Sequence, residues 1–135
     1  ESKSLKGVLR GLHYQLPPYT QAKLVRVIEG SVLDIAVDIR KSSPTFGQHV
    51  SVELTAQNKH QLFVPHGFAH GFIVLSDSAT FAYKVDNYYA PEHDRGIVFN
   101  DSDLSIDWQL PLEDLQLSDK DKEQPVLANA KDLFE

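Results

Sequence analysis

Short runs of alternating apolar and polar residues, ended by glycine, proline or asparagine, constrain this chain more than any other feature. Such runs are typical of β-strands, because successive side chains of a strand point to opposite faces. They cover residues 23–28, 31–39, 50–54, 61–64, 69–75 and 79–85. Glu29-Gly30 is expected to form a hairpin turn after the first of them. Many strands at regular spacing, with Gly and Pro at the turns, predict an all-β sandwich, jelly roll or barrel.

The C-terminal part of the chain has a different pattern. Leu104, Ile106 and Trp108 still alternate, but from Leu117 onward the sequence is typical of helical or irregular structure. Ser118 and Asp121 have the spacing of a helix N-cap followed by an acidic third residue. Because no linker or internal repeat is visible, we expect a single domain, 1–135, on which residues 116–135 pack as a short helical C-terminal extension.

Composition limits the class of protein. The 135 residues include no cysteine, which excludes disulfides and thiolate metal sites. The formal net charge of −6 argues against a general nucleic-acid-binding protein, although a small anionic ligand could bind where Arg and Lys gather. The sequence has no apolar run long enough for a membrane span and no recognisable signal peptide, so we expect a cytoplasmic enzyme.

Residues 7–15, with the sequence GVLRGLHYQ, combine a strand pattern with two chemically active side chains. Arg10 and His13 are an odd number of residues apart, so in a regular strand they would point to opposite faces. A bulge at the intervening Gly11 would turn both side chains into one cavity. The alternative is an edge strand whose polar residues face water.

Six histidines in a β-rich chain raise the question of a metal site. Residues 65–70, with the sequence PHGFAH, resemble the second motif of the cupin superfamily, but the two closely spaced histidines of the first motif are missing. His66 and His70 lie where a turn enters a strand, so their side chains are expected to diverge. We therefore expect no metal ion.

Several long motifs occur in order along the chain. They are GVLRGLHYQ at 7–15, KLVR at 23–26, SPTFG at 43–47, VPHGFAHGF at 64–72, YK at 83–84, YYAP at 88–91 and LSDKD at 117–121. Together they closely resemble the dTDP-4-dehydrorhamnose 3,5-epimerase family. The resemblance implies a cupin-type jelly roll that forms a homodimer and uses no metal or other cofactor. It also implies a dTDP-sugar substrate, dTDP-4-keto-6-deoxy-D-glucose, whose C3 and C5 are inverted through enol intermediates.

The resemblance assigns roles to seven residues. His13 matches the general base, and Asp121 matches the carboxylate that holds its imidazole, as the aspartate does in a serine-protease triad. Lys23 matches the group that stabilises the enolate oxygen, and Tyr83 matches the acid that returns a proton to the opposite face. The residues that match substrate-binding positions are Arg10, His70 and Tyr89.

Each of these residues also has a purely structural interpretation. Asp121 could only cap a helix, and Tyr83 shares its strand face with apolar neighbours, as a core tyrosine would. Lys23 could be solvated, and His70 could be a structural histidine.

The resemblance also leaves other functions open. The family has an N-terminal segment of several strands before the motif at Gly7, including strands exchanged between subunits, whereas this sequence begins only a few residues before it. We therefore expect either that this chain lacks part of the nucleotide-binding wall or that it is a fragment of a longer chain that contains it. Other departures are His66, Phe99 and Ser102, where glutamate, tryptophan and proline are usual. The alternatives are a deoxysugar epimerase of one carbon, a 3,4-ketoisomerase, or a non-catalytic sugar-nucleotide-binding jelly roll.

Overall fold

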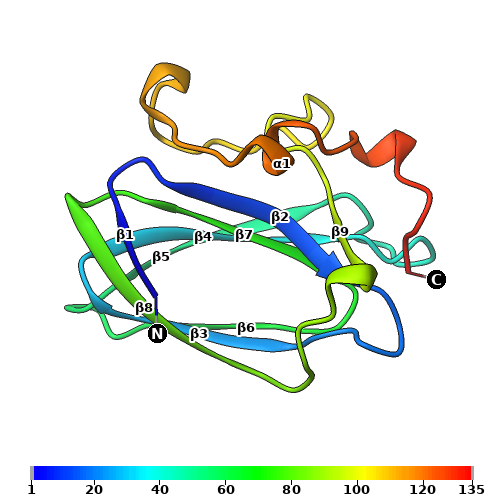
Figure 1. Ribbon diagram of the computed structural model, residues 1–135, viewed down its shortest axis with the longest axis horizontal. Helices are drawn as coiled ribbons and strands as arrows, with labels where there is room; N and C mark the ends of the chain where they lie inside the picture. The colour runs from blue at the N-terminus through cyan, green and yellow to red at the C-terminus, as the bar shows by residue number, and fades with distance from the viewer. Residues whose placement is uncertain (1, 135) are drawn as a thin grey trace.

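The alternating segments form antiparallel strands in the computed structural model, which describes residues 2–134. Within those residues the strands are β1 (Ser2–Leu5), β2 (Leu9–Gln15), β3 (Lys23–Glu29), β4 (Ser31–Asp38), β5 (His49–Thr55), β6 (Gln61–Val64), β7 (Phe68–Val74), β8 (Ser78–Val85) and β9 (Asp94–Gly96). They build a four-stranded sheet in the order β1-β8-β3-β6 and a five-stranded sheet in the order β5-β4-β7-β2-β9. The two sheets lie face to face, as Figure 1 shows. This is a cupin-like jelly-roll sandwich, and the predicted all-β fold is confirmed.

The predicted hairpin at Glu29-Gly30 is wrong. β3 belongs to the four-stranded sheet and β4 to the five-stranded sheet, so the turn carries the chain from one sheet to the other. Local turn chemistry predicted a reversal of direction correctly but could not show which strands pair, because jelly-roll pairing joins distant segments. β4 pairs with β5 and β7 instead.

The central strands β4 and β7 of the five-stranded sheet are buried on both faces. The inner face of this sheet packs against the four-stranded sheet through a cluster that includes Val25, Phe72 and Phe81. Its outer face packs under the C-terminal segment, which contributes Trp108 and other apolar residues to a second cluster. This covering explains why every residue of β4 after its first is buried. In Figure 1 the orange and red C-terminal segment lies over this sheet.

Helical structure in the described residues is short and almost confined to the C-terminal part. It comprises the α-helix α1 (Asp119–Lys122) and the 3₁₀ turns η1 (Pro91–His93), η2 (Leu112–Asp114) and η3 (Leu127–Asn129). Ser118 caps α1, since its hydroxyl accepts a hydrogen bond from the Asp121 N–H at 3.2 Å, as the spacing predicted. The alternation at 104–108 does not form a strand: Leu104 and Trp108 are buried in turns, with the Trp108 indole donating to the Phe99 carbonyl. None of the described helices is long and apolar enough to cross a membrane.

Candidate active site

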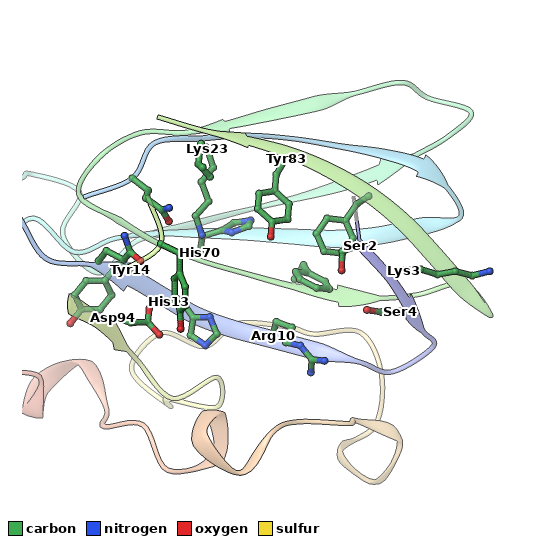
Figure 2. Close-up of a pocket in the computed structure, with 16 residues that line it drawn as sticks. Ser2, Lys3, Ser4, Arg10, His13, Tyr14, Lys23, His70, Tyr83 and Asp94 are labelled. Carbon is green, nitrogen blue, oxygen red and sulfur yellow. The ribbon is translucent and has the colours of Figure 1, made fainter. Parts of the chain in front are cut away.

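A cavity of about 560 Å³ lies between the two sheets. Six of the seven predicted site residues line it, and they come from four strands and one loop: Arg10, His13, Lys23, His70, Tyr83 and Tyr89. The seventh, Asp121, lies behind His13 and contacts its ring. Figure 2 shows Lys23 and Tyr83 extending into the cavity from one side, and His13 from the other. The fold therefore brings together residues that lie more than 100 positions apart in the chain.

Gly11 is the point at which β2 departs from regular alternation, as predicted. Arg10 pairs with Phe72 and His13 with His70, and the register shifts between the two pairs. Because Phe72 and His70 are two residues apart on β7, Arg10 and His13 point to the same face. The φ angle of Gly11 is +130°, and a Cβ atom there would lie 2.6 Å from the Gly71 Cα. Only glycine fits both the dihedral angle and the close approach of the two strands.

His13 and Asp121 form a tight pair. The Nε2 atom of His13 lies 2.5 Å from Oδ1 of Asp121, and the second carboxylate oxygen accepts the Gly11 N–H at 3.2 Å. The Asp121 side chain is 1% exposed, whereas that of His13 is 29% exposed toward the cavity. Burial alone would raise the pKa of Asp121, but the hydrogen bonds from His13 and Gly11 outweigh it, so the pKa lies below its ordinary value. Since an ionised carboxylate only accepts, the proton of neutral His13 is held on Nε2 and Nδ1 is left with a free lone pair.

Lys23 and Tyr83 bring a cation and a phenol to the opposite wall. Burial lowers the pKa of Lys23, while the negative charges of Asp34 and Asp94 act in the other direction. Tyr83 is 51% exposed, so it is not the core tyrosine that its apolar neighbours would allow. Its ring packs against Phe81 with centroids 5.9 Å apart, which leaves the hydroxyl end free to reach into the cavity. Lys23 is partly buried and its side chain lines the cavity, so it is not the freely solvated lysine that its position at a strand end would allow.

His70 belongs to a second histidine–aspartate pair that the sequence did not reveal. Its Nε2 lies 2.7 Å from Oδ1 of Asp34, a residue of β4 that is completely buried. The sequence carried no distinct signal for Asp34, because Asp34 and Asp38 both fall on the alternate face of β4, where aspartates are expected if that face meets water. His66 points elsewhere and contacts Asp86 at 2.8 Å, so the two histidines diverge as expected.

The cavity carries more positive than negative charge although the whole chain is acidic. Lys3, Arg10 and Lys23 line it, with Asp94 as the acidic lining residue. Asp94 is in turn paired with Lys120, which precedes Asp121 on α1. Such a local excess of cations suits an anionic ligand. Within the described part of the chain, no group of three or more His, Cys, Asp or Glu side chains could hold a metal ion.

Comparison with known proteins agrees with this geometry. The sequence profile of the dTDP-4-dehydrorhamnose 3,5-epimerase family matches residues 1–129. The Shigella flexneri enzyme of that name is 61% identical over 120 residues, which cover 89% of this chain and 65% of that enzyme. The crystal structure of the Elizabethkingia anophelis enzyme superposes with a TM-score of 0.93 at 55% identity, covering 95% of this chain and 70% of that one.

A further solved relative is dTDP-6-deoxy-D-glucose-3,5-epimerase from Legionella pneumophila, in complex with dTDP-4-keto-L-rhamnose. It gives a TM-score of 0.92 at 55% identity and covers 96% of this chain and 68% of that chain. The chain thus spans about two thirds of the length of the relatives that it matches. Over that span both the sequence and the fold agree, and the chain belongs to the dTDP-4-dehydrorhamnose 3,5-epimerase family.

Proposed function

We propose that this chain carries the catalytic machinery of an epimerase that inverts C3 and C5 of dTDP-4-keto-6-deoxy-D-glucose. One observation carries the proposal: a histidine–aspartate pair and a tyrosine lie on opposite sides of one cavity, with a lysine beside them. Inversion of a carbon requires that a proton leaves one face and another arrives on the opposite face. A pure binding site needs neither an acid nor a base.

The reaction follows from the acidity of carbons next to a ketone. Nδ1 of His13 takes the proton from C3 or C5, the C–H bond electrons form the enolate, and negative charge develops on the C4 oxygen. The ammonium of Lys23 stabilises that oxygen. The phenol of Tyr83 then donates its proton to the carbon from the other face. Solvent removes the proton from His13 and returns one to Tyr83, so protons and charge balance over each inversion.

Binding of the nucleotide is assigned to the cationic and aromatic part of the cavity. The guanidinium of Arg10, on the same face of β2 as His13, is suited to charge-assisted hydrogen bonds with the pyrophosphate. Tyr89 is exposed at the edge of the cavity and offers a ring against which a base can pack. His70, the cross-strand partner of His13, lines the same cavity and is assigned to the sugar. No cofactor takes part in the proposed steps.

The predicted homodimer also remains a proposal. Leu24 and Phe63 are cross-strand neighbours on β3 and β6, and both are exposed on the outer face of the four-stranded sheet. Adjacent exposed apolar side chains of this size favour a protein contact. Analytical ultracentrifugation of the wild type and of Phe63→Asp tests it: we expect a dimer that the substitution weakens.

The proposed reaction is tested by hydrogen exchange in deuterated water. The protein is incubated with dTDP-4-keto-6-deoxy-D-glucose, and label at each carbon is read by NMR and mass spectrometry. We expect deuterium at both C3 and C5, and we expect His13→Ala to abolish it. His60→Ala, which removes an exposed histidine from the turn before β6, is the matched control and should exchange normally. Label at only one carbon would indicate a single-carbon epimerase, and no label would indicate a binding protein.

A further inference from the structure

Among residues 2–134, Asp34 is a charged neighbour of the site with only one of its two oxygens in a hydrogen bond. Its side chain is 0% exposed on the inner face of β4, and Oδ1 lies 2.7 Å from Nε2 of His70. Its second oxygen, Oδ2, has no hydrogen-bond partner among the described residues. A buried carboxylate oxygen without a hydrogen-bond partner costs free energy. Its presence in the folded protein therefore calls for an explanation.

A second buried aspartate on the same strand shows what a structural carboxylate looks like here. Asp38 is also almost fully buried, but its oxygens accept hydrogen bonds from the Arg40 guanidinium and from the hydroxyls of Ser43 and Thr45. Those contacts tie the loop after β4 to the strand. Asp34 ties no loop, and a buried ion pair by itself adds little to stability compared with apolar packing. The charge of Asp34 is therefore better explained by the cavity that His70 and Lys23 line.

Lys23 lines the same cavity as His70, and its ammonium is influenced by the charge of Asp34. Asp34 is the foremost of the charges that favour the ammonium form of Lys23, and Asp94 of β9 is the other. The remaining titratable or charged side chains lining this cavity come from β1, β2, β7 and β8 and from the loop after β8: Lys3, Arg10, His13, Tyr14, His70, Tyr83 and Tyr89. Apart from His70, none of these side chains has a hydrogen bond or ion pair with Asp34 within residues 2–134.

We propose that Asp34 is a positioning residue that serves two groups of the site at once. One oxygen holds His70 in the tautomer with its proton on Nε2, and the other, which has no partner among the described residues, places a negative charge beside the cavity that Lys23 lines. His70 is then left with Nδ1 for a ligand, since no described residue bonds that atom. The inference rests on the proposed function, because Lys23 must be cationic to stabilise an enolate.

The test is Asp34→Asn, which keeps the shape of the side chain and removes its charge. An amide can either accept from Nε2–H or donate to a bare Nε2, so the ring of His70 is expected to become a mixture of tautomers. Nitrogen-15 NMR of histidine-labelled protein distinguishes the tautomers. Carbon-13 NMR of labelled lysine follows Lys23, whose titration midpoint should move to lower pH because the charge that favours the ammonium is gone. With substrate, kcat/KM should fall about 10- to 100-fold, which corresponds to the loss of one hydrogen bond to a charged group.

Asp38→Asn is the matched control, because it neutralises a buried aspartate on the same strand away from the cavity. It should lower stability without changing the His70 tautomer or the Lys23 midpoint. The proposal is overturned if Asp34→Asn leaves both signals as in the wild type. It is equally overturned if wild-type His70 carries its proton on Nδ1, a result that needs no folded variant. Because both spectra are recorded without substrate, a protein that lacks epimerase activity would refute the proposed function but leave this test intact.

Discussion

Replacing Gly11 by alanine tests whether the bend in β2 builds the site. The added Cβ would lie 2.6 Å from the Gly71 Cα and 3.0 Å from the His70 carbonyl oxygen, so two backbones must separate. A positive φ costs an alanine about 1–2 kcal/mol, and overpacking of this kind costs about 1–3 kcal/mol, which together predict a loss of about 2–5 kcal/mol. The shift would also pull the Gly11 N–H from Asp121 and turn His13 away from it.

Gly47→Ala provides the matched comparison. Gly47 also has a positive φ, +82°, but a Cβ there meets only a side-chain carbon of Leu127 at 3.8 Å. We therefore expect about 1–2 kcal/mol of destabilisation and unchanged exchange of substrate protons. Urea unfolding gives the free energy of unfolding of both variants, and the midpoint with an unchanged slope isolates the stability effect. Equal losses for the two alanines, with normal exchange in Gly11→Ala, would refute the close approach of β2 and β7 as the reason for glycine.

Three further substitutions test the electrostatics of the fold and site. Asp121→Asn should reduce kcat about 100- to 10,000-fold with a smaller change in KM. The amide can donate to Nε2 of His13, which leaves the proton of the ring on Nδ1, the atom that must act as base. Steady-state kinetics with a near wild-type kcat would contradict this. Hydrogen bonds from Arg40, then from Ser43 and Thr45, hold the pKa of Asp38 well below its usual range, so its stabilising effect is present above about pH 4 and lost as the pH falls further. Asp38→Asn should therefore be less stable than wild type at pH 7, with the gap in urea unfolding free energy closing in acid; a gap that is constant with pH would refute the linkage. Ser118→Ala should remove the cap of α1 at a cost of about 0.5–2 kcal/mol and lower kcat through Asp121. Ser118→Thr should restore both the stability and kcat. An alanine variant with full kcat would show that the cap does not position the carboxylate.

The sequence was sufficient for the type of fold but not for the pairing of strands. Period-two alternation marks a strand wherever one face is buried, and it located β3, β4 and β8 to within a residue. It could not show that the turn at Gly30 joins two sheets, because local dihedral chemistry is similar in a hairpin and in a crossing between layers. The alternation at 104–108 corresponds to no strand, because Leu104 and Trp108 are buried against the sheet from a turn and from irregular chain.

For the site, the sequence predicted six residues that line the cavity and missed Asp34, which pairs with one of them. The bulge at Gly11 was inferred from two functional side chains at an odd spacing, and the register shift confirms it. Asp34 was not predicted as a site residue because alternation places it on the face of β4 opposite the apolar residues. A polar residue is expected there if that face meets water. The face meets the second sheet instead, and that is a property of the tertiary structure.

The route by which Asp121 reaches His13 has a consequence for how the proposed activity would be lost. The two residues are 108 positions apart, and the carboxylate arrives on a one-turn helix in the irregular segment that covers the outer face of the five-stranded sheet. Segments of this kind open locally at lower free energy than the strands beneath them. The proposed general base is thus complete only while this cover is docked, so loss of the proposed activity on mild heating or in denaturant is expected to precede the loss of β-structure. Correct folding of the C-terminal segment that carries Asp121 is therefore required for the proposed chemistry of His13.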